Sequence, residues 1–317
     1  MKSIFIPRYF WNGTNDEVCT NTAVLVRDNR IEQIDEPEKL RLGYPEAQVL
    51  ESKDWLMMPA FVDAHDHGRG MSPISFRTPD RALEMWLQDL NKLPAIPHYQ
   101  ACYYDGMRLV SSGVGMVLHS HNPNSFAKIR EEMVAAEKGY KDAGIRSILC
   151  PLYLDQNKRI YYDRDKFISD LPEPLRTNFA AGIHDKIMSM NEYFQLVEGI
   201  CEDLADDIKA GWTEVQLHPN GGQWCSDEAL LQMKEYALEH GMYIHLHLLE
   251  TQYQAEYAKR TWGKSFIKHY KEIGFLGPWV SFAHAVWLDE EDLQLIAESG
   301  AHLITVSYTH LRAHETD

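Results

Sequence analysis

The sequence predicts an α/β protein: a TIM-type (β/α)8 barrel that stops after about its seventh strand and follows a small β module. Three observations carry this prediction. Short apolar runs alternate with turn residues over residues 1–58, and longer apolar runs alternate with helical segments over residues 59–306. Histidines stand at the ends of most of the longer runs. A chain of 317 residues, 44% of them hydrophobic, is long enough for one large domain and a small companion.

The first 58 residues have the pattern of a small β module. Ile4 to Ile6, Ala23 to Val26 and Ile31 to Ile34 are short apolar runs, and Asp28-Asn29 supplies a turn between the last two. Each run is the length of a strand and too short for a helix. We therefore expect a separate N-terminal part made of strands.

Residues 59–306 repeat a strand followed by a helix. Ser226 and Asp289 are helix N-caps, and Gly241 and Gly300 supply the left-handed residue that ends each helix. Strands are expected near residues 61–65, 114–119, 147–152, 213–218, 242–247, 279–284 and 301–306. Seven such strands in parallel βα units indicate an eight-stranded barrel without its last strand.

The last eleven residues break this order. Ser307–Asp317 resembles a translated sequencing adapter, and it stands where a loop after the seventh strand is due. We expect it to be a non-native tail, which leaves His310 and His314 out of the candidate ligands. The natural protein is expected to continue beyond Val306.

Composition excludes several classes of function. A formal net charge of -16 without a basic stripe argues against nucleic acid, and no apolar run approaches the roughly 18 residues of a membrane span. Pro7 cuts the N-terminal apolar run, so no signal peptide is expected. The five cysteines are scattered and form no Cys-x-x-Cys pair, which is typical of reduced thiols in the cytoplasm. A small neutral or cationic substrate is the expected partner.

Histidines mark the predicted strand ends. They are His65, His67, His119, His121, His218, His245, His247 and His284. The carboxyl ends of barrel strands form the catalytic rim of this fold. The series therefore predicts an active site at that rim.

The first motif is Pro59–Gly68, a buried strand that ends in His65-Asp-His67. Residues i and i+2 of a strand point to the same side, so both imidazoles face one ion. Neutral imidazole is the commonest metal ligand in proteins. His-x-His alone is a weak signal, but its position after a buried strand predicts a metal site.

The second motif is Ile244–Thr251. His247 ends the strand as a third metal ligand, and Glu250 is placed to act as general acid and base. Glu250 could instead be a solvated residue that opens a helix. His245 shares the face of His247, where it lines the pocket or supports the site.

The third motif is Val280–Leu288. His284 at its strand end is a candidate to hydrogen-bond the attacking water or the developing oxyanion. The alternative is a core histidine whose hydrogen bonds are satisfied within the protein. Trp86 and Leu87, in contrast, are expected to pack a helix against the barrel.

Together these motifs resemble the amidohydrolase superfamily, in the aminohydrolase branch of guanine and S-adenosylhomocysteine deaminases and triazine hydrolases. The likeness covers residues 1–306. It implies that residues 1–58 are part of a β-sandwich and that Pro59–Gly68 is the first-strand metal motif. Leu217–Ser226 is similar to the fourth-strand segment that faces substrate.

The resemblance implies one metal. Glu214–His218 offers no lysine that could be carbamylated to bridge two ions. Zn2+ is the expected ion and Fe2+ the alternative, held by His65, His67 and His247 together with an Asp that the family has at the end of strand eight, which leaves one position open for water. The family's remaining ligand, an Asp at the end of strand eight, would lie beyond Val306, so we expect the chain as it stands to be inactive.

The implied reaction is deamination of a nitrogen heterocycle. A metal-activated hydroxide attacks the carbon that bears the amino group, and Glu250 protonates the ring nitrogen and then the leaving amine. The expected substrate-binding residues are Arg69, His119, His121, His218, Gln223, Trp224 and His245. For Arg69, a surface charge is the alternative. By analogy with the family, the protein forms a homodimer.

Two other functions stay open. The same metal, water and Glu250 could hydrolyse a cyclic amide, a carbon–halogen bond or a C–N(alkyl) bond, since sequence alone does not decode pocket contacts. A barrel kept only as a non-catalytic scaffold is the second alternative. Intact His65, His67, His247, Glu250 and His284 argue against the scaffold.

Overall fold

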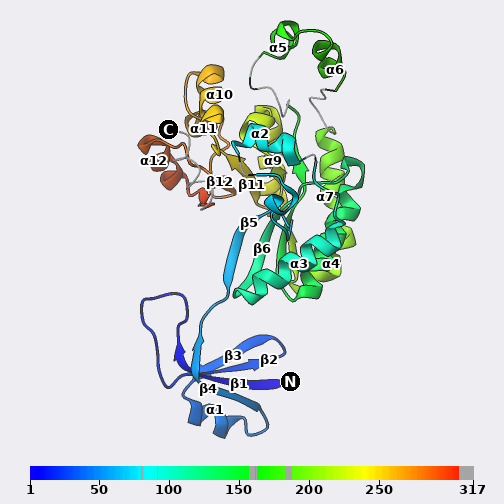
Figure 1. Cartoon of the computed structure of the whole chain (residues 1–317). Helices are drawn as coiled ribbons and strands as arrows, with labels where there is room; N and C mark the ends of the chain where they lie inside the picture. Colours follow the sequence, from blue (N-terminus) through cyan, green and yellow to red (C-terminus); the bar gives the residue numbers. More distant parts are fainter. Residues whose placement is uncertain (80, 91, 157–160, 162, 183–187, 307–317) are drawn as a thin grey trace. The chain divides into compact units, whose positions relative to one another are not determined.

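The structure is a computed structural model that describes residues 1–79, 81–90, 92–156, 161, 163–182 and 188–306 (Figure 1). The chain divides into two compact units, Met1–Phe61 and Val62–Asp317. This division lies close to the boundary predicted after residue 58. The tail interpreted as non-native, Ser307–Asp317, lies outside the described residues.

The first unit is a four-stranded sheet with one helix. Its strands are β1 (Lys2–Phe10), β2 (Ala23–Arg27), β3 (Arg30–Asp35) and β4 (Gln48–Met57), in the order β3-β2-β1-β4. Strands β2 and β3 form a hairpin through Asp28 and Asn29, which both have positive φ, as the favoured two-residue turn requires. The turn predicted at these residues is confirmed.

Helix α1 (Pro37–Gly43) connects β3 to β4, and β4 pairs with β1 in parallel. Leu40 of α1 packs against Ile4, Ile6 and Leu25 of the sheet. The sequence analysis expected only strands here and missed this helix, although Pro37 at its first position is a recognised start signal. The described residues of this unit form one sheet, so the second sheet of a sandwich stays a prediction.

The second unit contains parallel strands in chain order. They are β5 (Phe61–Asp66), β6 (Val114–Ser120), β7 (Arg146–Cys150) and β9 (Thr213–Val215) in one sheet, β11 (Ile244–Leu248), β12 (Val280–His284) and β13 (His302–Ile304) in another, and β8 (Leu152–Tyr153) paired with β10 (His218–Pro219). Single parallel bridges, Leu217 to Ile244 and Gly221 to His247, connect the segment after β9 to β11.

All seven strands predicted for this unit are present, two of them interrupted. The strand predicted at 147–152 divides into β7 and β8, and the one at 213–218 into β9 and β10. Pro151 stands at the first interruption and has no N–H to donate to a neighbouring strand. Within the described residues β13 pairs only with β12. The eighth strand of a closed barrel therefore stays a prediction.

Helices separate most of the strands (Figure 1). They are α2 (Leu83–Leu90), α3 (His98–Ser111), α4 (Ile129–Ala143), α5 (Arg164–Asp170), α6 (Leu175–Gly182), α7 (Met190–Asp203), α8 (Ala205–Ala210), α9 (Asp227–His240), α10 (Gln252–Trp262), α11 (Phe266–Glu272) and α12 (Glu290–Ser299). The predicted caps are confirmed: the Ser226 side chain accepts the Ala229 N–H, and Asp289 forms a capping box with Asp292. Among the described residues, no helix combines the length and apolarity needed to cross a membrane.

The alternation of side chains along β11 determines which residues face the site. Ile244, Leu246 and Leu248 of β11 belong to the hydrophobic core together with Leu230 and Met233 of α9. His245 and His247 alternate with these apolar residues and therefore point to the other side of the strand. The core side of β11 faces helix α9, and His245 and His247 lie on the opposite side of the strand.

Candidate active site

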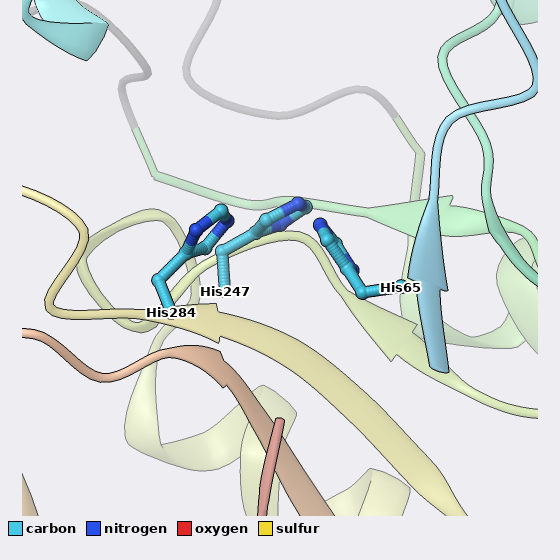
Figure 2. Close-up of side chains that lie close together, drawn as sticks. All are labelled: His65, His247 and His284. Atoms are coloured by element: carbon cyan, nitrogen blue, oxygen red, sulfur yellow. The ribbon is translucent and has the colours of Figure 1, made fainter. Parts of the chain in front are cut away.

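Three imidazoles from three strands converge at one end of the barrel. His65 of β5, His247 of β11 and His284 of β12 each offer one ring nitrogen, and these atoms lie within 4.8 Å of one another. Figure 2 shows the three rings directed toward a common space. All three side chains are buried. Three nitrogen donors at such separations can hold one metal ion.

His67, predicted as a ligand, lies at the margin of this group. Its ring centroid is 5.0 Å from that of His65 and 5.3 Å from that of His247, with which it stacks at an interplanar angle of 9°. Of the predicted ligands, the structure thus brings His65 and His247 together with His284, and His67 borders the same space.

Hydrogen bonds orient the rings of His67 and His247. His67 Nδ1 is 2.8 Å from the Ser120 carbonyl oxygen, and His247 Nδ1 is 2.5 Å from the Asn220 carbonyl oxygen. Because a carbonyl oxygen only accepts, an Nδ1 that bonds to one carries the proton and the Nε2 of that ring keeps its lone pair. The Asn122 amide group also lies 2.8 Å from His67 Nδ1. Metal-binding histidines in proteins are commonly oriented by such a bond from the other ring nitrogen.

His65 is held from behind by a second histidine. Its Nδ1 is 2.9 Å from His245 Nε2, and His245 Nδ1 is 2.8 Å from the Ser281 hydroxyl. Within the described part of the chain, His65 Nε2 is buried and has no hydrogen-bond partner. A buried nitrogen without a partner is costly, and a metal ion would satisfy it. The donor set therefore fits a divalent ion, and His245 contacts the ring nitrogen of His65 that lies opposite the unpartnered Nε2.

Burial keeps these imidazoles neutral. It lowers the pKa of His65, His67 and His247 well below the ordinary range; neighbouring histidines, His245 first, lower the pKa of His65 further, and Arg69 lowers that of His67. A histidine must be neutral to bind a metal. At neutral pH the rings are in the protonation state that coordination requires.

Glu250 lies beside His284. Its Oε2 is 3.5 Å from His284 Nε2, and the Glu250 backbone N–H donates to Gln254 Oε1 at 2.9 Å. Its side chain is 7% exposed, so it is not the solvated residue of the alternative interpretation. A buried carboxyl group next to an imidazole can carry protons between water and a substrate.

One pocket is lined by most of these residues. Its walls contain His67, Arg69, Trp224, His247, Glu250 and His284, all of them predicted site residues, together with Leu83, Trp86, Leu87, Asn122 and Asn220. The Arg69 guanidinium lies 5.0 Å from the centroid of the Trp86 ring, a cation–π contact. The sequence analysis missed Asn122 and Asn220, although both follow strand-end histidines, and it gave Trp86 and Leu87 only a packing role.

The other predicted substrate-binding residues do not line this pocket. His218 contacts the Ser120 hydroxyl at 2.8 Å, and Gln223 donates to the Tyr161 hydroxyl at 3.1 Å. His119 Nδ1 is 3.1 Å from the Tyr140 hydroxyl of α4, so His119 faces the helices, whereas Ser120 faces the site. His121 continues on the side of His119 and contacts Glu132 of α4. Contact of these side chains with substrate stays a prediction.

Comparison with known proteins places the barrel in a family. Residues 56–315 match the model of the amidohydrolase family, so the chain belongs to that family, and the resemblance inferred from the motifs is confirmed. The match runs into Ser307–Asp317, whose interpretation as a non-native tail stays a prediction.

The chain is 25% identical over 288 residues to 5'-deoxyadenosine deaminase of Methanosarcina barkeri. It is 26% identical over 289 residues to 5-methylthioadenosine/S-adenosylhomocysteine deaminase of Thermodesulfovibrio yellowstonii. Each alignment covers 89% of this chain and 57% of the relative, so the chain spans little more than half the length of these relatives.

A solved structure of similar fold is a zinc-bound adenosine deaminase from Xanthomonas campestris. The TM-score is 0.74 at 17% identity, with coverage of 98% of this chain and 66% of the other. At this identity the likeness concerns the fold, which is the TIM-barrel type of the amidohydrolase family. The predicted α/β barrel class is confirmed to this extent.

Proposed function

We propose that the protein removes the amino group of a nitrogen heterocycle by hydrolytic deamination. The proposed substrate class is a purine nucleoside or a related adenosine derivative. One observation carries the proposal: a ring nitrogen from each of His65, His247 and His284 lies within 4.8 Å of the other two, and the Glu250 carboxylate, 3.5 Å from His284, lines one pocket with His247 and His284. The names of the relatives, deaminases of 5'-deoxyadenosine and S-adenosylhomocysteine, support the substrate class.

His65, His67 and His247 are the proposed metal ligands. His67 and His247 present Nε2 because their Nδ1 atoms donate to backbone carbonyls, and His65 Nε2 lacks another partner in the described structure. A bound divalent ion, Zn2+ or alternatively Fe2+, would supply the Lewis acidity that makes water nucleophilic at neutral pH.

Glu250 and His284 perform the proton chemistry. Glu250 Oε2 accepts a proton from the attacking water and delivers it to the ring nitrogen next to the reacting carbon. The remaining proton of the added hydroxyl group then moves through the same carboxylate to the amino group, which leaves as ammonia while the hydroxyl oxygen becomes the carbonyl oxygen. The new C–O bond forms, the C–N bond breaks, and ammonia and a carbonyl product leave. His284 Nε2, 3.5 Å from Glu250 Oε2, is placed to hydrogen-bond the oxygen as negative charge develops on it.

The pocket walls suit a flat heterocycle. Leu83, Trp86 and Leu87 of α2 and Trp224 supply apolar and aromatic surface, and Asn220 supplies a buried amide nitrogen that lacks a partner among the described residues. Ligand pockets typically combine such an apolar wall with a few polar groups that fix orientation. Arg69 is the proposed contact for an acceptor group of the substrate.

An ammonia-release assay tests the proposal. The protein at its natural full length, loaded with zinc, is incubated with 5'-deoxyadenosine, adenosine, S-adenosylhomocysteine and guanine, and in parallel with a cyclic amide and a chlorinated triazine. Ammonia released from a purine substrate is the expected result. Ring opening of the amide or chloride release alone would refute deamination, and a zinc-loaded protein inert toward all of them would favour the scaffold.

We further propose a cytoplasmic location, a homodimer and the absence of nucleic-acid and membrane partners. The location is supported by five cysteines that form no disulfide, and the absence of nucleic acid by a net charge of -16. The dimer rests on analogy with the family alone.

A further inference from the structure

A second group of metal-ligating side chains lies outside the pocket. His98 begins α3, His121 follows β6, and Glu132 lies in the first turn of α4. One ligand atom from each of the three residues lies within 4.8 Å of the other two. None of the three is among the residues that line the active-site pocket.

The separations match those around a small tetrahedral ion. His98 Nε2 and His121 Nε2 are each 3.2 Å from Glu132 Oε2. Donor atoms bound to tetrahedral zinc at about 2.0–2.1 Å lie about 3.3 Å apart, from the geometry of the tetrahedron. Two of the three edges of the group therefore have the length that zinc coordination gives.

The group is buried and incompletely satisfied. The side chain of His98 is 10% exposed, that of His121 is fully buried, and that of Glu132 is 12% exposed. Among the described residues, His98 Nε2 has no partner that meets the geometry of a hydrogen bond, although it lies 3.2 Å from the Glu132 carboxylate. A buried nitrogen that faces a carboxylate without a hydrogen bond is well placed for an ion between the two.

The remaining contacts orient the ligands. The Asn124 and Ser125 backbone N–H groups donate to the two Glu132 oxygens at 3.0 and 3.1 Å. His121 Nδ1 is 3.1 Å from His119 Nε2, which fixes the plane of the His121 ring. Ligands of structural metal sites are commonly held by such outer contacts.

We propose that His98, His121 and Glu132 form a second metal site, for zinc or a similar divalent ion, that ties α3 and α4 to the loop after β6. Two imidazoles and a carboxylate are a common zinc donor set, and a water completes the tetrahedron. The proposal is independent of the deaminase function, since no residue of this group enters the pocket. It gives His121 a role other than substrate binding.

The test measures metal binding at this second site in a variant that lacks the ligands of the active-site metal. A His65→Ala/His247→Ala variant, stripped of metal, is titrated with Zn2+ against a chromophoric chelator, and Co2+ is added to a second sample to record the visible absorption of tetrahedral coordination. We expect one ion per chain. The further change Glu132→Gln, or His98→Gln, lowers the uptake to none, whereas Glu131→Gln, an exposed neighbour on α4, leaves it at one.

Circular dichroism spectra of every variant establish that the fold is retained. If the double variant does not fold, the comparison is made in the otherwise unchanged protein, where His98→Gln is expected to lower the zinc content from two ions to one. If His98, His121 and Glu132 share a proton and bind no metal, the double variant takes up no zinc. That result, or uptake unaffected by Glu132→Gln and His98→Gln, would overturn the second site.

Discussion

His67 and His284 flank the same pair of ligands but contact different groups. His67 donates from Nδ1 to the Ser120 carbonyl, which leaves Nε2 for a metal, whereas His284 Nε2 lies next to the Glu250 carboxylate. The first arrangement is that of a ligand, and the second that of a residue that handles protons or the oxyanion. The two histidines should therefore respond differently to removal.

We predict that His67→Ala lowers the zinc content by one ion per chain, because a ligand is lost. His284→Ala is expected to keep that zinc and to lower kcat by about 100- to 1,000-fold, since one oxyanion donor typically contributes that much. Elemental analysis and the ammonia assay on both variants check this. Loss of the ion in His284→Ala with retention in His67→Ala would show that the ligand assignment is reversed.

Glu250 has a distinct prediction. Glu250→Gln keeps the shape of the side chain and its pocket but removes the proton carrier, so we expect kcat to fall by about 100- to 10,000-fold with the zinc content unchanged. Glu256→Gln, on the neighbouring α10, serves as the control. Wild-type turnover in Glu250→Gln would exclude the proposed proton path.

For single residues, the sequence predicts which side chains lie near the active site but not the direction in which each one points. His65, His247 and His284 are predicted because they end buried strands, and Glu250 because it follows His247 by three residues. His119 and His121 satisfied the same criterion, yet their rings contact Tyr140 and Glu132 of α4. Which face of β6 turns inward depends on its pairing with neighbouring strands, which no local pattern in the sequence records.

The ends of β11 and β12 contain backbone in the left-handed region. Leu249, His284 and Ala285 have φ of 52°, 72° and 51°, although none is glycine. The Ala285 N–H donates to the Leu248 carbonyl at 2.7 Å, which connects the two turns. Such conformations cost free energy and concentrate at functional sites, and here they position His284 and Glu250.

We predict that Ala285→Gly raises the free energy of unfolding by up to about 1 kcal/mol, because glycine relieves the left-handed strain at little steric cost. Ala283→Gly, in the buried strand immediately before, is the matched control and should lower it by about 1 kcal/mol or more. Denaturant unfolding of the metal-free proteins measures both. Equal destabilisation by the two changes would argue against strain at residue 285.

Asp105 makes the packing of α3 sensitive to pH. Burial, and then the neighbouring Asp66, raise the pKa of Asp105 from 3.8 to about 8. Between these values the folded chain binds more protons than the unfolded chain, so the contribution of this carboxyl group to stability falls as pH rises from about 4 to about 8.

We therefore expect Asp105→Asn to stabilise the protein increasingly from pH 4 to pH 8, since asparagine stays neutral throughout. Thermal melts across this range, with the exposed Asp54→Asn as control, measure the difference in Tm. A constant difference between the two variants at all pH values would contradict the raised pKa of Asp105.

Elements were predictable wherever local signals agreed. The helix capped by Ser226 and ended by Gly241 combined a cap, an apolar face and a stop, and it was located closely. Helix α1 has only seven residues, too few for a clear helical pattern. The interruption between β9 and β10 contains no proline that would indicate it in the sequence. Both depend on how the chain packs rather than on local preference.

For the whole molecule, the pattern of strands and strand-end histidines was sufficient to indicate the fold and the family. The second ligand group was not predictable in this way, because His98 and Glu132 come from helices whose packing against each other brings them to His121. The eighth strand and its Asp ligand, expected after Val306, stay predictions, and the relatives extend well beyond the length of this chain.

The central claim is that His65, His67 and His247 bind one catalytic metal. The most direct measurement is anomalous X-ray scattering at the zinc absorption edge from crystals of the protein grown with zinc. The account predicts a peak about 2.0–2.1 Å from the Nε2 atoms of these three residues. Zinc-loaded crystals with ordered rings and no peak between them would contradict the claim.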